Sequence, residues 1–177
     1  MSLNIFLLLP KYLINIIFLK NIIFLTIINL YIYLIILIFK YLDIYLCKIL
    51  LDICSVDYPF NTYRFNIIYI LFSLFFNKKL IIYIFNFEIF NVNSIQYIFD
   101  CSIWLEREIN DLFGIYFFNN IDLRRILTDY NLNGYPLRKD FPIIGFNEIF
   151  YNEEKKKLEY DEISNFFRIF NLKNEIY

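Results

Sequence analysis

The sequence contains no histidine, no alanine, and only three glycines among its 177 residues. Without histidine, a general base that works near neutral pH has to be a carboxylate, a lysine or a thiol with a shifted pKa. Three isolated glycines exclude both the G-x-G-x-x-G turn and the phosphate-binding P-loop. The sequence therefore offers no recognisable cradle for a nucleotide.

Cysteine is also scarce, with three residues at Cys47, Cys54 and Cys101 that form no C-x-x-C pair. A tetrahedral zinc site or a four-thiolate iron–sulfur cluster needs four ligands, which this chain alone cannot supply. We interpret the three as free, buried thiols in a reducing compartment. No metal site is expected.

What the sequence has in abundance is apolar residues, at 59% of the chain, with 22% aromatic. Ile, Phe, Tyr, Asn and Lys share AT-rich codons, so the composition suggests an organellar or otherwise AT-rich genome and inflates hydropathy everywhere. The first arginine is Arg64, and neither a basic n-region nor a small-residue cleavage site precedes it. We expect neither a secretory signal nor a transit peptide, and a product made inside an organelle would need neither.

A membrane span is one of two interpretations of the N-terminal third. Nineteen uncharged residues lie between Lys20 and Lys40, which is long enough for a spanning helix. Alternatively, Asn29 divides this stretch into a buried strand, IIFLTII, and a helix, LYIYLIILIFKYL, packed on a sheet. Periodicity leaves both open, so a small integral membrane protein anchored by residues 22–39 is one hypothesis.

Other segments have clearer local signals. Pro10 followed by KYLINIIFLK predicts a helix over residues 11–20, and LCKILLDIC predicts a strand over 46–54 that ends at a turn. RFNIIYILFSLFF and KLIIYIFNF, joined at Asn77 and Lys78, predict an antiparallel hairpin because they are rich in β-branched and aromatic residues.

Two further helices are expected. The first is short, lies in NVNSIQYIF, and is capped by Asn93 or Ser94. The second, IWLEREINDLF, is capped by Ser102 and ended by Gly114, with one apolar stripe and its charges facing elsewhere. The residues of this stripe are Leu105, Ile109 and Leu112.

Beyond Gly114 the sequence loses regular periodicity, and Asn, Gly and Pro occur where a helix would fail. We expect an ordered arm over residues 115–177, following an α+β domain over residues 1–114. The domain is expected to have two layers, with helices on a small mixed sheet that contains the antiparallel hairpin.

Charge is concentrated late in the chain: residues 1–105 carry twelve charged side chains, whereas residues 106–177 carry ten basic and thirteen acidic ones. Glu106, Glu108 and Asp111 are the best candidates for acid/base catalysis. However, Arg107 and Asp111 are four residues apart and Glu108 and Asp111 three, which predicts an exposed or partner-facing ion-pair network. Pairing with arginine lowers a carboxylate pKa, which disfavours catalysis.

The basic residues of the arm allow two interpretations. Arg124, Arg125, Arg138 and Lys139 could bind phosphate, but guanidinium groups suit bidentate pairs with acidic groups of this chain or of a partner. No sustained basic stripe is visible, so nucleic-acid binding is not expected.

Three stretches together resemble one family. LEREINDLFGIYF, DLRRILTDY and GYPLRKDFP are similar to the thirty-kilodalton-type peripheral-arm subunit of respiratory complex I, NADH:ubiquinone oxidoreductase, which is called subunit 9 in mitochondria and has a C-type counterpart in bacteria. The resemblance covers about residues 46–170. In two places this chain departs from the family pattern: Asn120-Ile121 replaces His-Pro, and Tyr135 replaces the histidine of Gly-His-Pro.

The resemblance implies a non-catalytic structural subunit whose arm wraps on the forty-nine-kilodalton-type subunit near the quinone site. It implies no cofactor in this chain, with flavin, iron–sulfur clusters and quinone in other subunits, and a place on the matrix side of the inner mitochondrial membrane. The expected partner-binding residues are Glu106, Arg107, Glu108, Asp111, Arg124, Arg125, Arg138, Lys139 and Asp140. The membrane-anchored protein and a free-standing enzyme using Glu106, Glu108 and Asp111 are the competing hypotheses.

Overall fold

The computed structural model describes residues 13–19 and 21–162. Its centre is a five-stranded sheet in the order β1-β2-β5-β4-β3. All neighbouring strands pair antiparallel except β2 and β5, which are parallel, so the sheet is mixed. The strands are β1 (Leu13–Leu19), β2 (Ile22–Ile28), β3 (Ile49–Asp57), β4 (Phe65–Ser73) and β5 (Lys78–Asn86).

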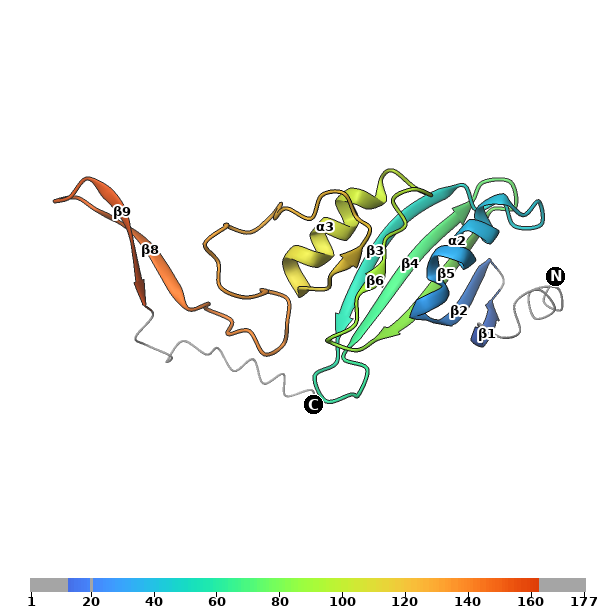
Figure 1. Ribbon diagram of the computed structural model, residues 1–177, viewed down its shortest axis with the longest axis horizontal. Helices are drawn as coiled ribbons and strands as arrows, with labels where there is room; N and C mark the ends of the chain where they lie inside the picture. Colours follow the sequence, from blue (N-terminus) through green and yellow to red (C-terminus); the bar gives the residue numbers. More distant parts are fainter. Residues whose placement is uncertain (1–12, 20, 163–177) are drawn as a thin grey trace, which may run out of the picture.

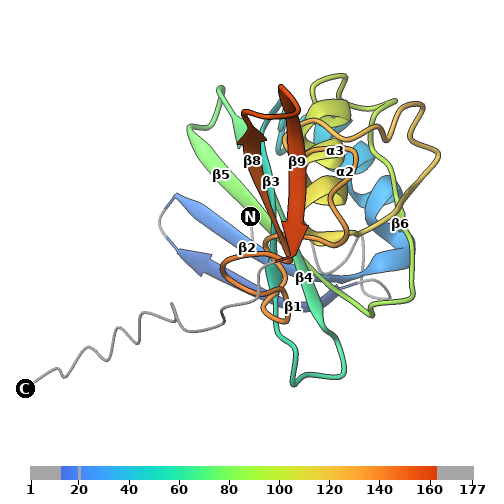
Figure 2. The ribbon, with the colours of Figure 1, turned by 90° about the vertical axis from the view of Figure 1, so that its left-hand side faces the viewer.

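Two helices, α2 (Ile32–Tyr41) and α3 (Ser102–Phe113), cover the same face of this sheet (Figures 1 and 2). The core between the layers is formed by fully buried side chains from alternate strand positions and from one side of each helix. Leu25, Ile67, Tyr69 and Ile82 come from the strands, and Phe39 comes from α2. The predicted α+β class, with helices on a mixed sheet, is therefore confirmed.

The predicted helix over residues 11–20 is wrong where the structure describes it, because residues 13–19 form strand β1. Residues 11, 12 and 20 lie outside the described residues. β1 pairs antiparallel with β2 over its length. By periodicity, an apolar run of seven residues fits a strand as well as a helix. Pairing with β2 at the edge of the sheet decides for the strand.

The division of the long apolar stretch at Asn29 is confirmed. β2 ends at Ile28, a single turn of 3-10 helix (η1, Asn29–Tyr31) follows, and α2 begins at Ile32. The Asn29 side-chain amide donates to Asn86 Oδ1 at 2.9 Å and to the Asn91 carbonyl at 3.0 Å, which fixes the turn. Within the described part of the chain, no helix is long and apolar enough to span a membrane. The anchoring helix over residues 22–39 is therefore not formed.

The predicted hairpin is confirmed as β4 and β5, which pair from Phe65↔Asn86 to Ser73↔Lys78. Asn77 takes the positive φ that closes the turn. The strand predicted at 46–54 begins later and runs to Asp57. The expectation of three buried thiols is wrong in part: Cys47 is buried, Cys54 is half-buried and Cys101 is exposed. Burial raises the pKa of Cys47 to about 11, which suits an unreactive core thiol.

The short helix predicted within residues 91–99 is wrong. Val92–Asn93 form the strand β6, which pairs with β7 (Phe117–Phe118), and turns follow. Ser94 caps no helix, because only turns follow it. Its hydroxyl donates to the Glu106 carboxylate at 2.6 Å and accepts the Gln96 N–H at 3.2 Å.

The second helix is confirmed as α3, although two of its predicted details are wrong. Ser102 is its first residue, and the cap position is Cys101, which makes no side-chain capping hydrogen bond. The buried face of α3 includes Glu106, Arg107 and Asp111 beside Ile109, whereas Leu105 and Leu112 are only partly buried. Three of the four charged side chains of α3 therefore face inward, and Glu108 faces solvent. Gly114 ends the helix with φ 73°, as predicted.

The arm follows β7. Residues 119–146 contain no helix or strand, and they run back along α3 before the antiparallel hairpin of β8 (Asn147–Asn152) and β9 (Lys157–Glu162). This hairpin projects from the domain in Figure 1. Residues 119–146 have the irregular course expected of the arm, whereas strand β7 and the β8–β9 hairpin were not foreseen.

Candidate partner-binding site

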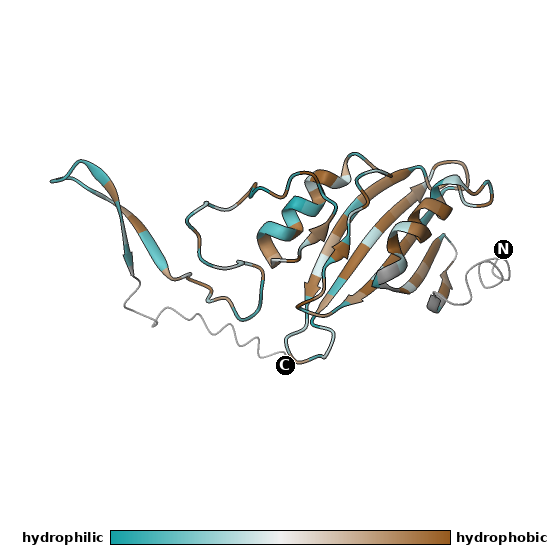
Figure 3. Ribbon diagram, in the orientation of Figure 1, coloured by the Kyte–Doolittle hydropathy of each residue, from teal (hydrophilic) through white to brown (hydrophobic). Residues whose placement is uncertain are grey.

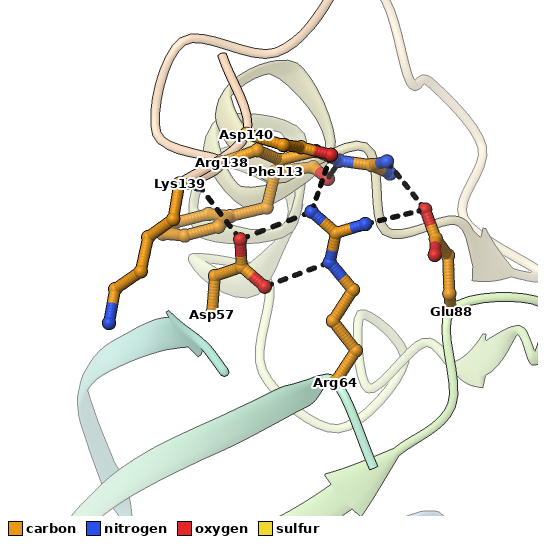
Figure 4. A network of polar contacts seen from close by, with 7 residues as sticks. All are labelled: Asp57, Arg64, Glu88, Phe113, Arg138, Lys139 and Asp140. Atoms are coloured by element: carbon orange, nitrogen blue, oxygen red, sulfur yellow. Dashed lines mark hydrogen bonds and ion pairs between the residues drawn. The ribbon is translucent and has the colours of Figure 1, made fainter. Parts of the chain in front are cut away.

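The C-terminal end of α3 lies beside a network of charges that joins the arm to the sheet (Figure 4). Arg64, immediately before β4, donates to Asp57 at 2.9 and 3.2 Å and pairs with Glu88 at 3.1 Å and Asp140 at 2.8 Å. A bidentate guanidinium–carboxylate pair has defined geometry as well as charge. Arg64 therefore fixes Asp140 of the arm against the end of the sheet.

Two more arm residues close the same network. Arg138 donates from Nε to the Phe113 carbonyl at 2.6 Å and from Nη1 to Glu88 at 2.8 Å. The backbone N–H of Lys139 donates to Asp57 at 2.9 Å. Burial alone would raise the pKa of Asp57, but the hydrogen bonds from Arg64 and Lys139 outweigh it and lower that pKa. Asp57 is therefore ionised when it accepts the hydrogen bonds from Arg64 and from the Lys139 N–H.

Asp111 holds a second point of the arm. Its side chain is buried, and Oδ2 accepts the backbone N–H groups of Ile126, Leu127 and Thr128 at 3.2, 2.8 and 2.9 Å. The Thr128 hydroxyl donates to Oδ1, and Arg125 lies 3.6 Å from the same oxygen. Burial would raise the pKa of Asp111, but these donors lower it. Asp111 thus acts as an intrachain anchor for residues 126–128.

Glu106 holds the beginning of the arm and is fully buried, with 0% of its surface exposed. It accepts hydrogen bonds from the Ser94 hydroxyl at 2.6 Å, the Ile95 N–H at 2.8 Å and the Asn120 side-chain amide at 2.7 Å. Burial raises the pKa of Glu106, and these donors only partly oppose it. Asn120, one of the two departures from the family pattern, is therefore part of this network.

Arg107, on the same helix as Glu106 and Asp111, also contacts the arm. Its Nε donates to the Arg124 carbonyl at 3.0 Å, its Nη1 lies 3.7 Å from Asp122, and its guanidinium stacks 5.0 Å from the Trp104 ring. Like Glu106 and Asp111, it is buried. The predicted exposed ion-pair network on this helix is therefore wrong for these three residues, which contact the chain's own arm.

The remaining predicted residues stay closer to solvent. Glu108 is exposed on α3, and the Arg124 side chain is 73% exposed while pairing with Asp122 at 2.8 Å. Lys139 is exposed, with its ammonium 5.7 Å from the Tyr58 ring. These side chains are accessible to a partner, and their role in binding one stays a prediction.

The second departure, Tyr135, also has a defined place. Its ring lies 4.6 Å from the Arg138 guanidinium and packs on Gly114, where an added Cβ would come within 2.5 Å of the ring. Five residues of these networks were not predicted as part of the site: Asp57, Arg64, Glu88, Ser94 and Asn120. Of these, only Arg64 could have been singled out from the sequence, because it is the only arginine before residue 107.

The β8–β9 hairpin has two chemically different faces. Ile149 is paired with Tyr160 and Tyr151 with Leu158, so these four exposed apolar side chains share one face. The other face has the pairs Glu148↔Asp161, Phe150↔Glu159 and Asn152↔Lys157. An isolated two-stranded hairpin is marginally stable in water, so an apolar face of this kind needs a surface to cover it.

A cavity of about 260 Å³ opens between the arm and this hairpin. Tyr160 donates to Asp129 at 3.1 Å across it, and both residues line it. The other residues that line it include Leu132, Phe141, Ile143, Ile144, Phe146 and Ile149. The cavity continues the apolar face of the hairpin and can accept an apolar side chain.

The described residues contain no group of three or more His, Cys, Asp or Glu that could hold a metal ion. Glu106 and Asp111 are both occupied by hydrogen bonds within the chain. The arrangement suits fixing one segment of chain against another.

The sequence profile of the family described as "Respiratory-chain NADH dehydrogenase, 30 Kd subunit" matches residues 34–147. The chain belongs to this family. The match runs from α2 to the first residue of β8. It includes the three carboxylates that hold the arm, Asp57, Glu106 and Asp111, and leaves out β1, β2 and the rest of the hairpin. The family expected from the three sequence stretches is therefore confirmed.

Individual relatives agree with this assignment. The chain is 45% identical over 120 residues to the C-type subunit of NADH-quinone oxidoreductase of Dinoroseobacter shibae, covering 67% of this chain and 56% of that protein. It is 38% identical over 126 residues to NADH-ubiquinone oxidoreductase subunit 9 of Reclinomonas americana, covering 70% and 62%. The matched part of this NADH dehydrogenase family chain thus spans less than two thirds of either relative.

A chain of a solved structure has the same fold. It comes from the membrane-bound sulfane sulfur reductase, an archaeal respiratory membrane complex, and it superposes with a TM-score of 0.67 at 21% identity over 79% of this chain and 83% of that chain. At this level of identity the likeness supports the α+β fold of this NADH dehydrogenase family chain and nothing finer.

Proposed function

We propose that this chain is a non-catalytic structural subunit in the peripheral, quinone-module arm of respiratory complex I. In this role it supports electron transfer from NADH to ubiquinone, coupled to proton translocation, by holding other subunits in a fixed geometry. Flavin, iron–sulfur clusters and quinone belong to those subunits. The membership of the chain in the thirty-kilodalton subunit family carries the proposal.

The proposed partner is the forty-nine-kilodalton-type subunit, bound by the arm of residues 115–177. Supporting this, three buried anchors, Glu106, Asp111 and Asp57, fix the arm on the domain. Beyond them the hairpin presents Ile149, Tyr151, Leu158 and Tyr160 to solvent on one face. Ordering the arm before binding reduces the entropy cost of docking it on a partner.

The proposed location is the matrix side of the inner mitochondrial membrane, with the chain encoded in the organelle. The relative from Reclinomonas americana is named as subunit 9 of an NADH-ubiquinone oxidoreductase, the mitochondrial name of this subunit. The absence of alanine and the abundance of Ile, Phe, Asn and Lys agree with an AT-rich genome.

The test compares two aromatic truncations on opposite faces of β8. Tyr151, 57% exposed, is on the apolar face and is changed by Tyr151→Ser. Phe150, 43% exposed, is on the charged face and is changed by Phe150→Ser as the matched control. Mitochondria carrying the tagged full chain are extracted in mild detergent, and the polypeptides that accompany the tag are identified and quantified.

We expect the wild-type chain to recover the forty-nine-kilodalton-type subunit and Tyr151→Ser to lower that recovery about tenfold, the scale of one interface anchor. Phe150→Ser should change it about twofold or less. A wild-type chain that is recovered alone would refute the proposed function. Equal recovery with both variants would show that the apolar face of the hairpin is not the contact.

A further inference from the structure

We propose that the face of the five-stranded sheet opposite the helices is a second docking surface, which packs against an apolar, largely uncharged surface of another subunit of the complex. The inference rests on the proposed function, but it concerns a different part of the chain from the arm. We call this surface the open face. Its central residues are Phe24 of β2, Ile68 and Ile70 of β4, and Ile81 and Tyr83 of β5.

The strands have apolar side chains on both faces. In β4, Ile67, Tyr69 and Leu71 are buried against the helices, whereas Ile68, Ile70 and Phe72 alternate with them and are half-buried. β5 has the same pattern, and the ribbon of both strands is hydrophobic over most of its length (Figure 3). Antiparallel strands with one solvated face normally alternate between apolar and polar residues. The missing alternation indicates that both faces of this sheet are covered in the assembled state.

Nucleotide bias does not explain the open face. The same bias that enriches Ile and Phe also enriches Asn and Lys, which are available for solvated positions. At the start of β5 such a residue does occur on this face, as the exposed Lys79. Near its centre the chain mostly uses Ile, Phe and Tyr instead, with Thr26 beside Tyr83. The choice follows position on the sheet and not composition.

The apolar side chains form one continuous patch. Strand register aligns Ile17, Phe24, Ile81 and Ile70 across four neighbouring strands. In the next row Tyr83 lies beside Ile68, and its ring stacks on Phe24 with centroids 6.0 Å apart. Contiguous apolar patches of several neighbouring strands are rare on proteins that act as monomers, and they mark interaction sites.

The charges around this patch indicate what covers it. Among residues 13–19 and 21–162, Lys79 and Asp52 stand at its margins, with one charge of each sign and no basic cluster. An anionic lipid surface attracts clusters of Lys and Arg, which the described part of this face does not have. A flat, uncharged patch fits a protein layer of aliphatic and aromatic side chains. Because the relatives are named as subunits of oxidoreductases, the occupant we infer is another subunit.

The first test replaces Tyr83 by the photoreactive residue p-benzoylphenylalanine in the full chain. The change keeps an aromatic ring at a half-buried position, so the fold is preserved. The complex is irradiated after mild extraction, and again after dissociation. We expect an adduct with a different polypeptide in the intact complex and its loss after dissociation. An adduct with lipid, with a second copy or with the chain itself, or no adduct, would overturn the inference.

The second test uses neighbouring residues on β5. Ile81→Asn changes the open face, whereas Ile82→Asn changes a residue that is 0% exposed on the helix side. We expect Ile82→Asn to lose the folded chain. Ile81→Asn should leave the chain protease-resistant but lower recovery of the subunit marked by the Tyr83 adduct about tenfold. Unchanged recovery of that subunit would contradict the inference.

The proposed function and the open-face inference are contradicted by different results. If the chain recovers other subunits but Tyr83 gives no protein adduct, the open face is not an interface and the proposed function stands. If the wild-type chain recovers no other subunit, the proposed function is refuted and the open-face inference falls with it.

Discussion

Asp111 Oδ2 accepts the backbone N–H of Leu127 at 2.8 Å, sixteen residues later in the chain. The neighbouring N–H groups of Ile126 and Thr128 point at the same oxygen. One buried carboxylate therefore determines the course of the arm just after Arg124 and Arg125. A carboxylate that paired only with residues of its own helix could not fix the arm in this way.

We predict that Asp111→Ala exposes the arm to proteolysis at Arg124 and Arg125. The substitution leaves three backbone donors without their acceptor, which costs about 1–3 kcal/mol for each group that stays buried. Limited trypsin digestion followed by mass spectrometry measures the rate of cleavage at these two arginines. Glu108→Ala, on the exposed side of the same helix, is the control and should leave the rate unchanged. Equal rates for both variants would show that Asp111 does not hold the arm.

A pH dependence follows from Glu106, whose pKa is raised by burial. A carboxyl group with a raised folded-state pKa favours the folded state fully below its unfolded pKa of about 4.3. This contribution falls as pH rises from there through the raised folded-state pKa. Glu106→Gln does not titrate, so the variant should become more stable relative to wild type between acidic and neutral pH.

Urea denaturation at about pH 5 and pH 8 measures this difference in free energy of unfolding. Glu108→Gln, at an exposed position, should show no such change with pH relative to wild type. A wild-type-minus-Glu106→Gln difference that is the same at both pH values would show that burial of Glu106 does not penalise its charge.

The sequence predicted those elements that local information decides. The β4–β5 hairpin has two β-rich runs joined by a short turn at Asn77, and Gly114 takes the positive φ that ends α3. Asn29 interrupts the apolar run between β2 and α2, and its amide donates to the Asn86 side chain and the Asn91 carbonyl. In each case one residue type with a strong preference for turns marks the boundary.

What the sequence could not give was the direction in which the charges of α3 face. Helical spacing places Arg107 and Asp111 on neighbouring positions, but it does not say whether solvent or another segment covers them. Here the covering segment is residues 120–128, which return to the helix only in the tertiary structure. The strand at residues 13–19 was missed for a similar reason, since its partner β2 is itself placed by β5, more than fifty residues later.

Arg64 should not be replaceable by lysine. Its guanidinium contacts Asp57, Glu88 and Asp140 together, with the side chain only 14% exposed. An ammonium group cannot reproduce this planar, multidentate geometry. We expect Arg64→Lys to lower the free energy of unfolding by about 1–3 kcal/mol, as for loss of charged hydrogen bonds to the buried Asp57. Arg124→Lys, at an exposed pair with Asp122, should leave it almost unchanged. Urea denaturation compares the two, and similar losses would mean that the Arg64 network has no special stabilising role.

Gly114, at the end of α3, should be harder to replace than Gly145 of the arm, for two separable reasons. A non-glycine residue at φ 73° is strained by roughly 1–2 kcal/mol. In addition, a Cβ at Gly114 would come within 2.5 Å of the Tyr135 ring, whereas one at Gly145, with φ 85°, would meet nothing within 4 Å. Gly145→Ala therefore measures backbone strain alone, and Gly114→Ala measures strain plus displacement of Tyr135.

Because Tyr135 stacks on Arg138, the larger effect of Gly114→Ala should extend to that arginine. We expect Gly114→Ala to cost at least about 1 kcal/mol more in urea unfolding than Gly145→Ala, and to release the arm to proteolysis at Arg138. If both substitutions cost the same, the contact between Gly114 and Tyr135 does not fix the arm.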